Sequence, residues 1–285
     1  MKKQIQSLML ASLVLGTASA ALAGAYGEKG TAEEIPAAAP SGEEAAGPVM
    51  RRSDGFVTDA ETARGLYAEV GSLYAEEYHP TIVGDAQFNK TWAQLAYGRE
   101  MWEVGVALPS YEYLHQEGVG TLKDFTDLRL WAKVLPIRTK LFTFGGGLVV
   151  TFPTAGSGLG TDEYGFEPFV TGAVQAGPAS IRYSGGYNVY TAPSAPLAKD
   201  TFDSFDENLA VLAPVCEHVV LRTELTHQHL TVNDGDPVMV VPGADVRFDL
   251  GNNVDLLLRP SVGVGITEAP DWQVGLGLAV NAGGL

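Results

Sequence analysis

Two histidines spaced two residues apart are the first candidates for chemistry. His227 and His229 flank Gln228, and alternate residues of a strand share a face, so both imidazoles would point the same way. Such a pair can bind a transition metal, but a zinc site needs three or four ligands and no third ligand is evident. By alternation the pair shares a face with Leu221 and Leu225. We therefore interpret both as interfacial histidines beside a loop, and we predict no metal site and no cofactor.

Catalytic motifs are the second candidates. A lipid-active enzyme needs a serine nucleophile beside a histidine, and no Gly-x-Ser-x-Gly stretch accompanies the histidine pair. Cys216 is the sole cysteine, so an intrachain disulfide is excluded. A lone thiol is more often a small buried residue than a nucleophile. We predict that the protein is not an enzyme, and we keep an outer-membrane lipid-active enzyme as the weakest alternative.

Acidic stretches in the predicted loops are a third candidate. Residues 233–236 (NDGD) resemble part of a calcium loop but lack the distal Glu of an EF-hand. Residues 162–163 and the stretch 200–207 are also acidic. A polar hairpin turn is the better interpretation of 233–236. Loose binding of divalent cations at these loops stays an alternative.

Charged side chains that alternate with apolar ones carry the most information. In the segment 126–134, Leu128 and Leu130 fall on one face of a strand while Arg129 and Lys133 fall on the other. Opposite signs on neighbouring strands can form cross-strand ion pairs. In a closed barrel this charged face lines the lumen. The lumen-lining residues predicted in this way are Asp127, Arg129, Lys133, Arg182, Arg222, Glu224, Asp245, Arg247, Asp255 and Arg259.

One hairpin allows its register to be predicted. Residues 251–253 (GNN) tolerate positive φ and suit a tight turn. Centring the turn on Asn252 places Asp245 opposite Arg259. We expect these two side chains to pair inside the barrel, with the carboxylate shared with Arg222 or Arg247.

The elements that must position these residues are strands, because apolar residues alternate with polar or small ones from about residue 63 onward. We predict twelve strands, at 64–76, 90–97, 101–115, 126–135, 139–153, 164–175, 179–190, 206–215, 219–229, 237–249, 254–265 and 271–283. Tight links are expected at 98–100, 136–138, 177–178, 216–218 and 251–253. Longer loops are expected between them, at 77–89, 116–125, 154–163, 191–205, 230–236 and 266–270. Short turns that alternate with long loops are typical of outer-membrane barrels.

A secreted β-sandwich shows the same alternation and is the competing fold. Many of the predicted strands have ten residues or more, whereas strands usually have about 5–6. Aromatic residues gather near the predicted strand ends, as the interfacial girdles of a membrane barrel require. The fold class that we predict is therefore all-β, a closed antiparallel transmembrane β-barrel of about 12 strands over residues 63–285.

The N-terminal residues predict export. Residues 1–23 contain two lysines, then an apolar run at 7–16, and then small residues. This order is the pattern of a cleaved signal peptide. The run is about half the ~20 residues that a spanning helix needs. Residues 24–62 are rich in Ala, Glu, Pro and Gly and predict a flexible periplasmic arm. We expect 24–57 to lie outside the lumen, with a plug inside the barrel as the weaker alternative.

Four short stretches resemble one family of outer-membrane proteins. Residues 127–133 (DLRLWAK) resemble the G-D-L-x-L-x-x-K strand of the phenol-degradation meta-pathway family, and 152–156 (FPTAG) resemble its L-P-T-G stretch. Residues 167–172 (EPFVTG) and 97–98 (YG) fit the same pattern. The sequence has Thr126 where the family usually has Gly. The resemblance implies a transporter-like barrel without a defined substrate.

These observations lead to three ordered hypotheses about function. The first is an outer-membrane channel or transporter-like barrel for small solutes, with aromatic or hydrophobic compounds implied by the resemblance alone. The second is a structural or surface barrel with a packed interior, and the third is the lipid-active enzyme. The expected partners are outer-membrane lipid and a small-molecule solute. The net charge of −16 excludes a nucleic-acid-binding protein, because phosphate recognition needs a basic face. The sequence leaves the solute, the state of the lumen and the oligomeric state open.

Overall fold

The structure is a computed structural model of the chain. It describes residues 59–79, 84–117, 120–155, 160, 163–191, 204–230, 236–267 and 269–283. The predicted signal peptide, the arm through residue 58 and most of the acidic stretch 233–236 lie outside these residues. Over the described residues, no helix is long and apolar enough to cross a membrane.

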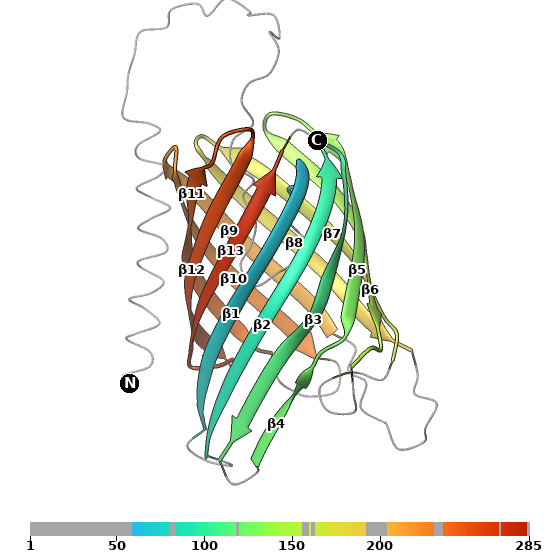
Figure 1. Cartoon of the computed structure of the whole chain (residues 1–285), viewed down its shortest axis with the longest axis vertical. Coiled ribbons are helices and arrows are strands. Elements are labelled where there is room, and N and C mark those ends of the chain that lie inside the picture. Colours follow the sequence, from blue (N-terminus) through green and yellow to red (C-terminus); the bar gives the residue numbers. More distant parts are fainter. Residues whose placement is uncertain are drawn as a thin grey trace, which may run out of the picture.

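Antiparallel strands wrap around one axis and are strongly tilted (Figure 1). They are β1 (Gly65–His79), β2 (Gly84–Arg99), β3 (Trp102–Gln116), β4 (Gly120–Phe125), β5 (Leu128–Arg138), β6 (Phe142–Phe152), β7 (Gly165–Ala176), β8 (Ala179–Tyr190), β9 (Ser204–Cys216), β10 (Val219–Leu230), β11 (Val238–Asp249), β12 (Val254–Thr267) and β13 (Trp272–Ala282). We call the rim that carries the short links the turn end, and the opposite rim the loop end.

Pairing between β1 and β13 closes the ring, and β2 pairs with both β1 and β3. The first half of β3 pairs with β5 and its second half pairs with β4. These two pairings make β4 and β5 two parts of one interrupted strand, so the ring has twelve strands. The predicted closed antiparallel barrel with an even number of strands is confirmed.

Three of the predicted connections are wrong. The stretch 77–89, expected to be a loop, belongs to β1 as far as His79 and to β2 from Gly84 onward. The stretch 116–125, expected to be a loop, contains β4, because Thr126 exchanges hydrogen bonds with Ser110 of β3 and keeps the chain on the ladder. The link expected at 136–138 is part of β5. The ladder between β5 and β6 shifts between Val134 and Ile137, so these residues form an irregularity in the sheet and the turn follows after them.

The hairpin between β11 and β12 has the register that the sequence predicts. Asp249 pairs with Asp255, and Val246 pairs with Leu258. In both pairs the residue numbers add up to the same value, which is also the sum for Asp245 and Arg259. Gly251, Asn252 and Asn253 have φ of 80°, 54° and 59°, in the left-handed region that Gly and Asn tolerate.

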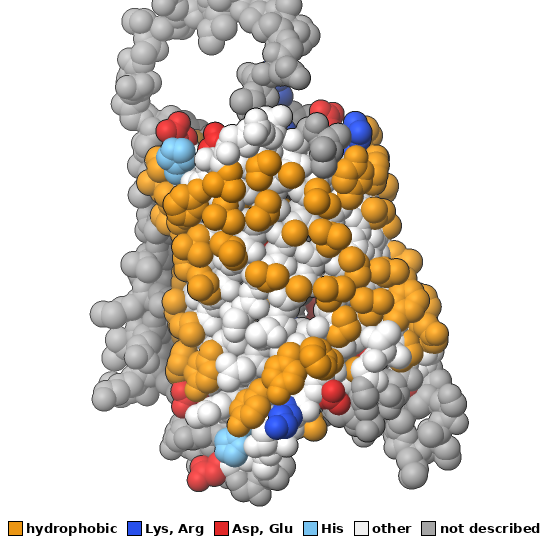
Figure 2. All heavy atoms as spheres, viewed as in Figure 1, with side chains coloured by type: hydrophobic (Ala, Val, Ile, Leu, Met, Phe, Trp, Pro, Cys, Tyr) orange, Lys and Arg blue, Asp and Glu red, His pale blue; other side chains and the backbone are white. Residues whose placement is uncertain are grey.

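The barrel wall separates apolar from polar side chains. The outward row of β13 runs from Trp272 to Val280 and its residues are 38–53% exposed, whereas the inward Ala279 is 0% exposed. Figure 2 shows apolar side chains spread over the wall, with charged side chains near the rims. Aromatic pairs lie at both rims: Tyr97 and Trp102 at the turn end, with ring centroids 5.9 Å apart, and Tyr74 and Trp272 at the loop end, 5.4 Å apart.

Candidate functional site

The inward faces of the strands gather the charged residues that the sequence singles out. Seven of the ten predicted residues are buried: Asp127, Lys133, Arg182, Arg222, Glu224, Asp245 and Arg259. The other three are half-buried: Arg129, Arg247 and Asp255. They lie at three levels of the barrel interior: the middle, the turn end and the loop end. That these side chains line a path for solute stays a prediction.

A cluster of ion pairs fills the middle of the barrel. This central cluster consists of Glu69, Arg222, Glu224, Asp245 and Arg259. Asp245 Oδ1 accepts hydrogen bonds from Arg222 Nη1 and from Arg259 Nε, the latter at 3.1 Å. Arg259 Nη1 also lies 3.1 Å from Glu69 Oε1, and Arg222 Nε lies 2.7 Å from Glu224 Oε1. The predicted pair between Asp245 and Arg259, shared with Arg222, is therefore confirmed.

Neutral side chains complete the central cluster. Tyr67 and Gln94 donate to Glu69 at 2.8 Å and 2.6 Å, and Asn208 donates to Glu224 at 3.3 Å. Each of these residues is at most 5% exposed. Buried charges are stable only when they are paired and hydrogen-bonded. Every charge of the central cluster has an oppositely charged partner, although Arg222 Nη2 and Asp245 Oδ2 have no hydrogen-bond partner among the described residues. The cluster and its neutral partners come from one side of the ring, from β9 to β12 and from β1 and β2, and their burial shows that they are tightly packed.

At the turn end, residues 59–63 cross the lumen, and we call them the crossing segment. The backbone N–H of Ala63 donates to Glu103 of β3 at 2.5 Å, and Lys133 Nζ of β5 donates to the carbonyl of Asp59 at 2.9 Å. Arg182 of β8 donates to the carboxylate of Asp59 at 2.9 Å. The order β1, β2, β3, β5, β6, β7, β8 puts β8 six steps from β1 in a ring of twelve. The segment therefore reaches from β1 to the opposite wall.

This placement changes the boundary expected for the arm. Residues 59–62, the last four of the predicted flexible segment 24–62, lie inside the barrel, and Asp59 and Thr62 are buried. Arg138 binds Glu61 at 3.0 Å. Lys133 and Arg182, which are buried, and Arg138 contact Asp59 and Glu61 from the barrel wall, while the flexibility of the arm stays a prediction.

Four predicted residues belong neither to the central cluster nor to the contacts with the crossing segment. Asp127 Oδ1 accepts from the backbone N–H groups of Thr154 and Ala155, both at 3.0 Å, and so ties the loop that follows β6. Arg129 donates to Glu167 at 2.7 Å nearer the loop end. The remaining two pair with each other at the turn end, where Arg247 Nε lies 2.8 Å from Asp255 Oδ1.

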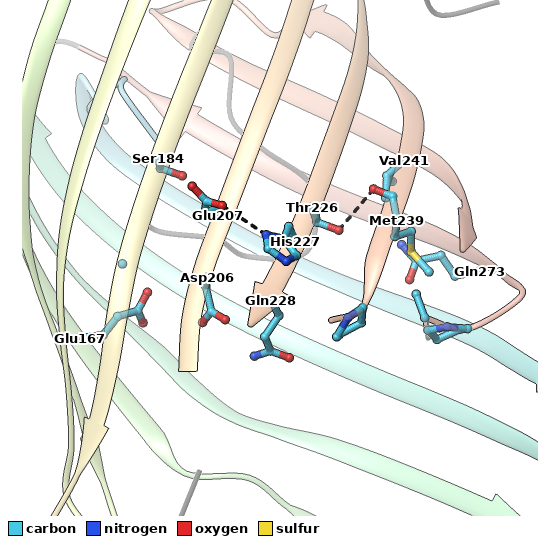
Figure 3. Close-up of a pocket in the computed structure, with 14 residues that line it drawn as sticks. Glu167, Ser184, Asp206, Glu207, Thr226, His227, Gln228, Met239, Val241 and Gln273 are labelled. Carbon is cyan, nitrogen blue, oxygen red and sulfur yellow. Dashed lines mark hydrogen bonds and ion pairs between the residues drawn. The ribbon is translucent and has the colours of Figure 1, made fainter. Parts of the chain in front are cut away.

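At the loop end the barrel contains a cavity of about 230 Å³. Its lining residues come from β7 to β11, from β13 and from the segment before β13. They include Glu167, Ser184, Gly186, Asp206, Gln228, Met239 and Gln273. Figure 3 shows Asp206 and Gln228 on neighbouring strands near Thr226 and His227, and the register pairs Gln228 with Asp206. This cavity, which we call the entrance cavity, can hold a small molecule.

The histidine pair lies on the outward face near the loop end, as expected. His227 Nδ1 lies 3.2 Å from Glu207 Oε2, and His229 Nδ1 lies 2.5 Å from Asp236 Oδ1. No group of three or more His, Cys, Asp or Glu residues that could hold a metal ion occurs among the residues that the structure describes. Cys216 is exposed rather than buried, because it lies at the end of β9 beside the turn to β10.

The sequence interpretation missed four interior carboxylates. Glu69 and Glu103 lie on inward rows of predicted strands, and Glu167 lies on a third, so alternation alone could have found them. Asp59 precedes the first strand and had no such signal. With these four residues the interior carries carboxylate partners for the cations of both the central cluster and the turn end.

Comparison with known proteins supports the fold. No family model and no curated sequence matches the chain. An outer-membrane channel from Pseudomonas putida F1 superimposes with a TM-score of 0.60 at 13% sequence identity, over 80% of this chain and 100% of that chain. The β domain of the Bordetella autotransporter BrkA reaches 0.49 at 14% identity (77% and 99% covered), and the KdgM porin 0.47 at 10% identity (74% and 97%). The first likeness shows that the fold is that of an outer-membrane β-barrel.

Proposed function

We propose that the protein is an outer-membrane channel for small solutes. The observation that carries this proposal is the division of the wall, with apolar rows facing outward and buried or half-buried charges facing inward. Such a wall is stable when lipid surrounds it and polar groups fill or line its interior. The proposal includes export through a cleaved signal peptide at 1–23, and a turn end that faces the periplasm.

In this proposal the entrance cavity is the first position that a solute occupies. The central cluster and the crossing segment lie between this cavity and the turn end. Both are packed, so we expect only a narrow path and a small conductance. The crossing segment is the more easily displaced of the two, because it belongs to the chain before β1 rather than to the wall itself.

Two observations bear on the class of solute, and they favour different classes. The phenol-degradation family that the sequence resembles favours aromatic or hydrophobic compounds, and that support rests on the resemblance alone. The entrance cavity presents carboxylates, amides and a hydroxyl, which favour a hydrophilic solute at this position. Among the described residues that line this cavity, the one histidine, His227, contacts Glu207 on the outward face, which gives no support to the lipid-active enzyme.

A second candidate is a structural barrel with a packed interior. Full burial of Arg222, Lys133 and Glu103, together with the crossing segment, favours it. This candidate predicts that the barrel conducts neither in its natural form nor after the crossing segment is released.

Planar-bilayer recording on the purified mature protein separates the two candidates. We expect discrete conductance steps from the natural protein and larger steps from a variant whose crossing segment is no longer held, Asp59→Asn with Glu61→Gln. Absence of conductance from both proteins, when both are shown to be folded by their heat-dependent mobility on gels, overturns the channel proposal and supports the packed barrel.

A further inference from the structure

We propose that the entrance cavity is a binding site for a small solute that carries a protonated amine together with hydroxyl groups. The inference rests on the proposed function, since it names the class of solute that the channel takes at its loop end. Its basis is the way the cavity is built, the charge of its lining and its size.

Two glycines shape the cavity walls. A Cβ atom at Gly186 of β8 would lie 2.7 Å from Glu167 Oε1, and one at Gly263 of β12 would lie 2.5 Å from Cγ of Gln273. Carbon atoms do not approach so closely, so side chains at these positions would push Glu167 and Gln273 away from the wall. Glycine therefore lets a carboxylate and an amide lie flat against the barrel, with the space in front of them open.

The lining is rich in hydrogen-bond acceptors and negative charge. Its inward carboxylates are those of Glu167 and Asp206, and the lining contains no Lys or Arg among the described residues. The carboxylate of Glu207 lies on the outward face of β9, where it also contacts His227. Arg129 engages Glu167 from outside the lining at 2.7 Å. Glu207 accepts from Tyr183 at 2.7 Å. An anion placed in this cavity meets like charges at short range, whereas an ammonium group meets opposite ones.

Asp206 is the carboxylate best placed to meet a solute. It stands in β9 between Gly186 of β8 and Gln228 of β10, which are its register partners. The amides of Gln228 and Gln273 and the hydroxyl of Ser184 also line the cavity. Amides and hydroxyls both donate and accept hydrogen bonds, so they suit the hydroxyl groups of a solute.

The size of the cavity limits the solute. Its volume of about 230 Å³ is small for a ligand site, since such sites commonly have about 300–1,000 Å³. A three-carbon amino diol fits in such a volume, while a polycyclic or long-chain compound fits only in part. The site is therefore suited to the recognition of a compact polar head.

Three matched three-carbon probes test the proposal: 2-amino-1,3-propanediol, glycerol and glycerate. Binding to the full mature protein in detergent micelles is measured by saturation-transfer NMR titration. We expect the amine to bind at least about tenfold more tightly than glycerate, with glycerol between them. Glycerate that binds as tightly as the amine, or equal binding of all three probes, overturns the proposal.

Two sets of variants locate the binding. Asp206→Asn should weaken the amine about tenfold and leave glycerol unchanged, while Glu217→Gln, the same change at the opposite rim, should alter neither. Gly263→Ala should push Gln273 into the cavity and weaken all three probes. Unchanged amine binding in Asp206→Asn, or unchanged binding of all three probes in Gly263→Ala, contradicts the site.

The outcome is separable from that of the channel proposal. Binding is measured at equilibrium and needs no passage through the barrel. Amine binding without conductance supports the site and removes the channel, while conductance without selective amine binding supports the channel and removes the site.

Discussion

Arg259 Nε donates a hydrogen bond to Asp245 Oδ1 at 3.1 Å, and the two residues lie opposite each other in the register of the β11–β12 hairpin. The same carboxylate oxygen accepts from Arg222 of β10. One buried carboxylate thus joins three neighbouring strands on the inside of the barrel. Its removal would leave two guanidinium groups close together in an interior that water scarcely reaches.

We expect Asp245→Asn to destabilise the barrel by about 3–5 kcal/mol, the usual cost of breaking a buried ion pair by removing one partner. Urea unfolding in lipid vesicles, followed by tryptophan fluorescence, measures this loss. Asp249→Asn is the control, because Asp249 is exposed at the end of β11 and should change stability little. If the two variants are equally stable, the central cluster does not stabilise the barrel.

Release of the crossing segment should increase conductance. Asp59→Asn removes the charge that Arg182 binds, and Glu61→Gln removes the charge that Arg138 binds. We expect larger single-channel steps from the double variant in planar bilayers, because the segment would lose its hold on the opposite wall. Glu217→Gln at the exposed β9–β10 turn serves as the matched control. Steps of unchanged size would show that the segment does not limit the path.

The β11–β12 turn should be sensitive to side chains that resist positive φ. Asn253 has a φ of 59°, a conformation that costs most L-residues roughly 1–2 kcal/mol. We therefore expect Asn253→Val to lower the free energy of unfolding by about that amount, and Asn253→Gly to preserve it. Equal stability of both variants in urea would mean that the turn rearranges without cost.

A charged residue on the outward face of the wall should destabilise the barrel at mid-height and change its stability little at the rim. Leu276 lies near the middle of β13 and is 53% exposed, so in a bilayer it faces hydrocarbon. We expect Leu276→Arg to cost about 2–4 kcal/mol and Leu250→Arg, beside the β11–β12 turn, about 0–1 kcal/mol. Unfolding from vesicles measures both. A small cost at Leu276 would contradict the inside–outside assignment of β13.

The features that the sequence predicts well are those set by the two-residue period. In the segment 126–134 each residue has only two possible directions, and lipid on one side decides between them, so the inward direction of Arg129 and Lys133 follows. The strand order follows from the short links, and the β11–β12 register follows from the turn at 251–253. Alternation predicts the face of the strand on which a side chain lies, but it predicts neither the position of the side chain along the barrel axis nor the residue that it contacts. For that reason Asp127, placed correctly on the inward face, was expected in the lumen lining although it binds backbone N–H groups of a loop.

The features that escaped prediction depend on contacts distant in sequence. Asp59 and Arg182 are 123 positions apart, and the residues around Asp59 have the composition of a flexible arm. The entrance cavity also had no sequence signal, because Gly186 and Gly263 define it only through the side chains on the strands beside them.

The contact between Asp59 and Arg182 also constrains the order of assembly. The N-terminal residues leave the ribosome first, yet the carboxylate of Asp59 cannot meet Arg182 until β8 has taken its place across the ring. Contacts between residues so far apart in sequence are slow to form. The first residues of the described chain are thus among the last to reach their final positions. Their contact with β8 can form only after the strands between β1 and β8 have paired.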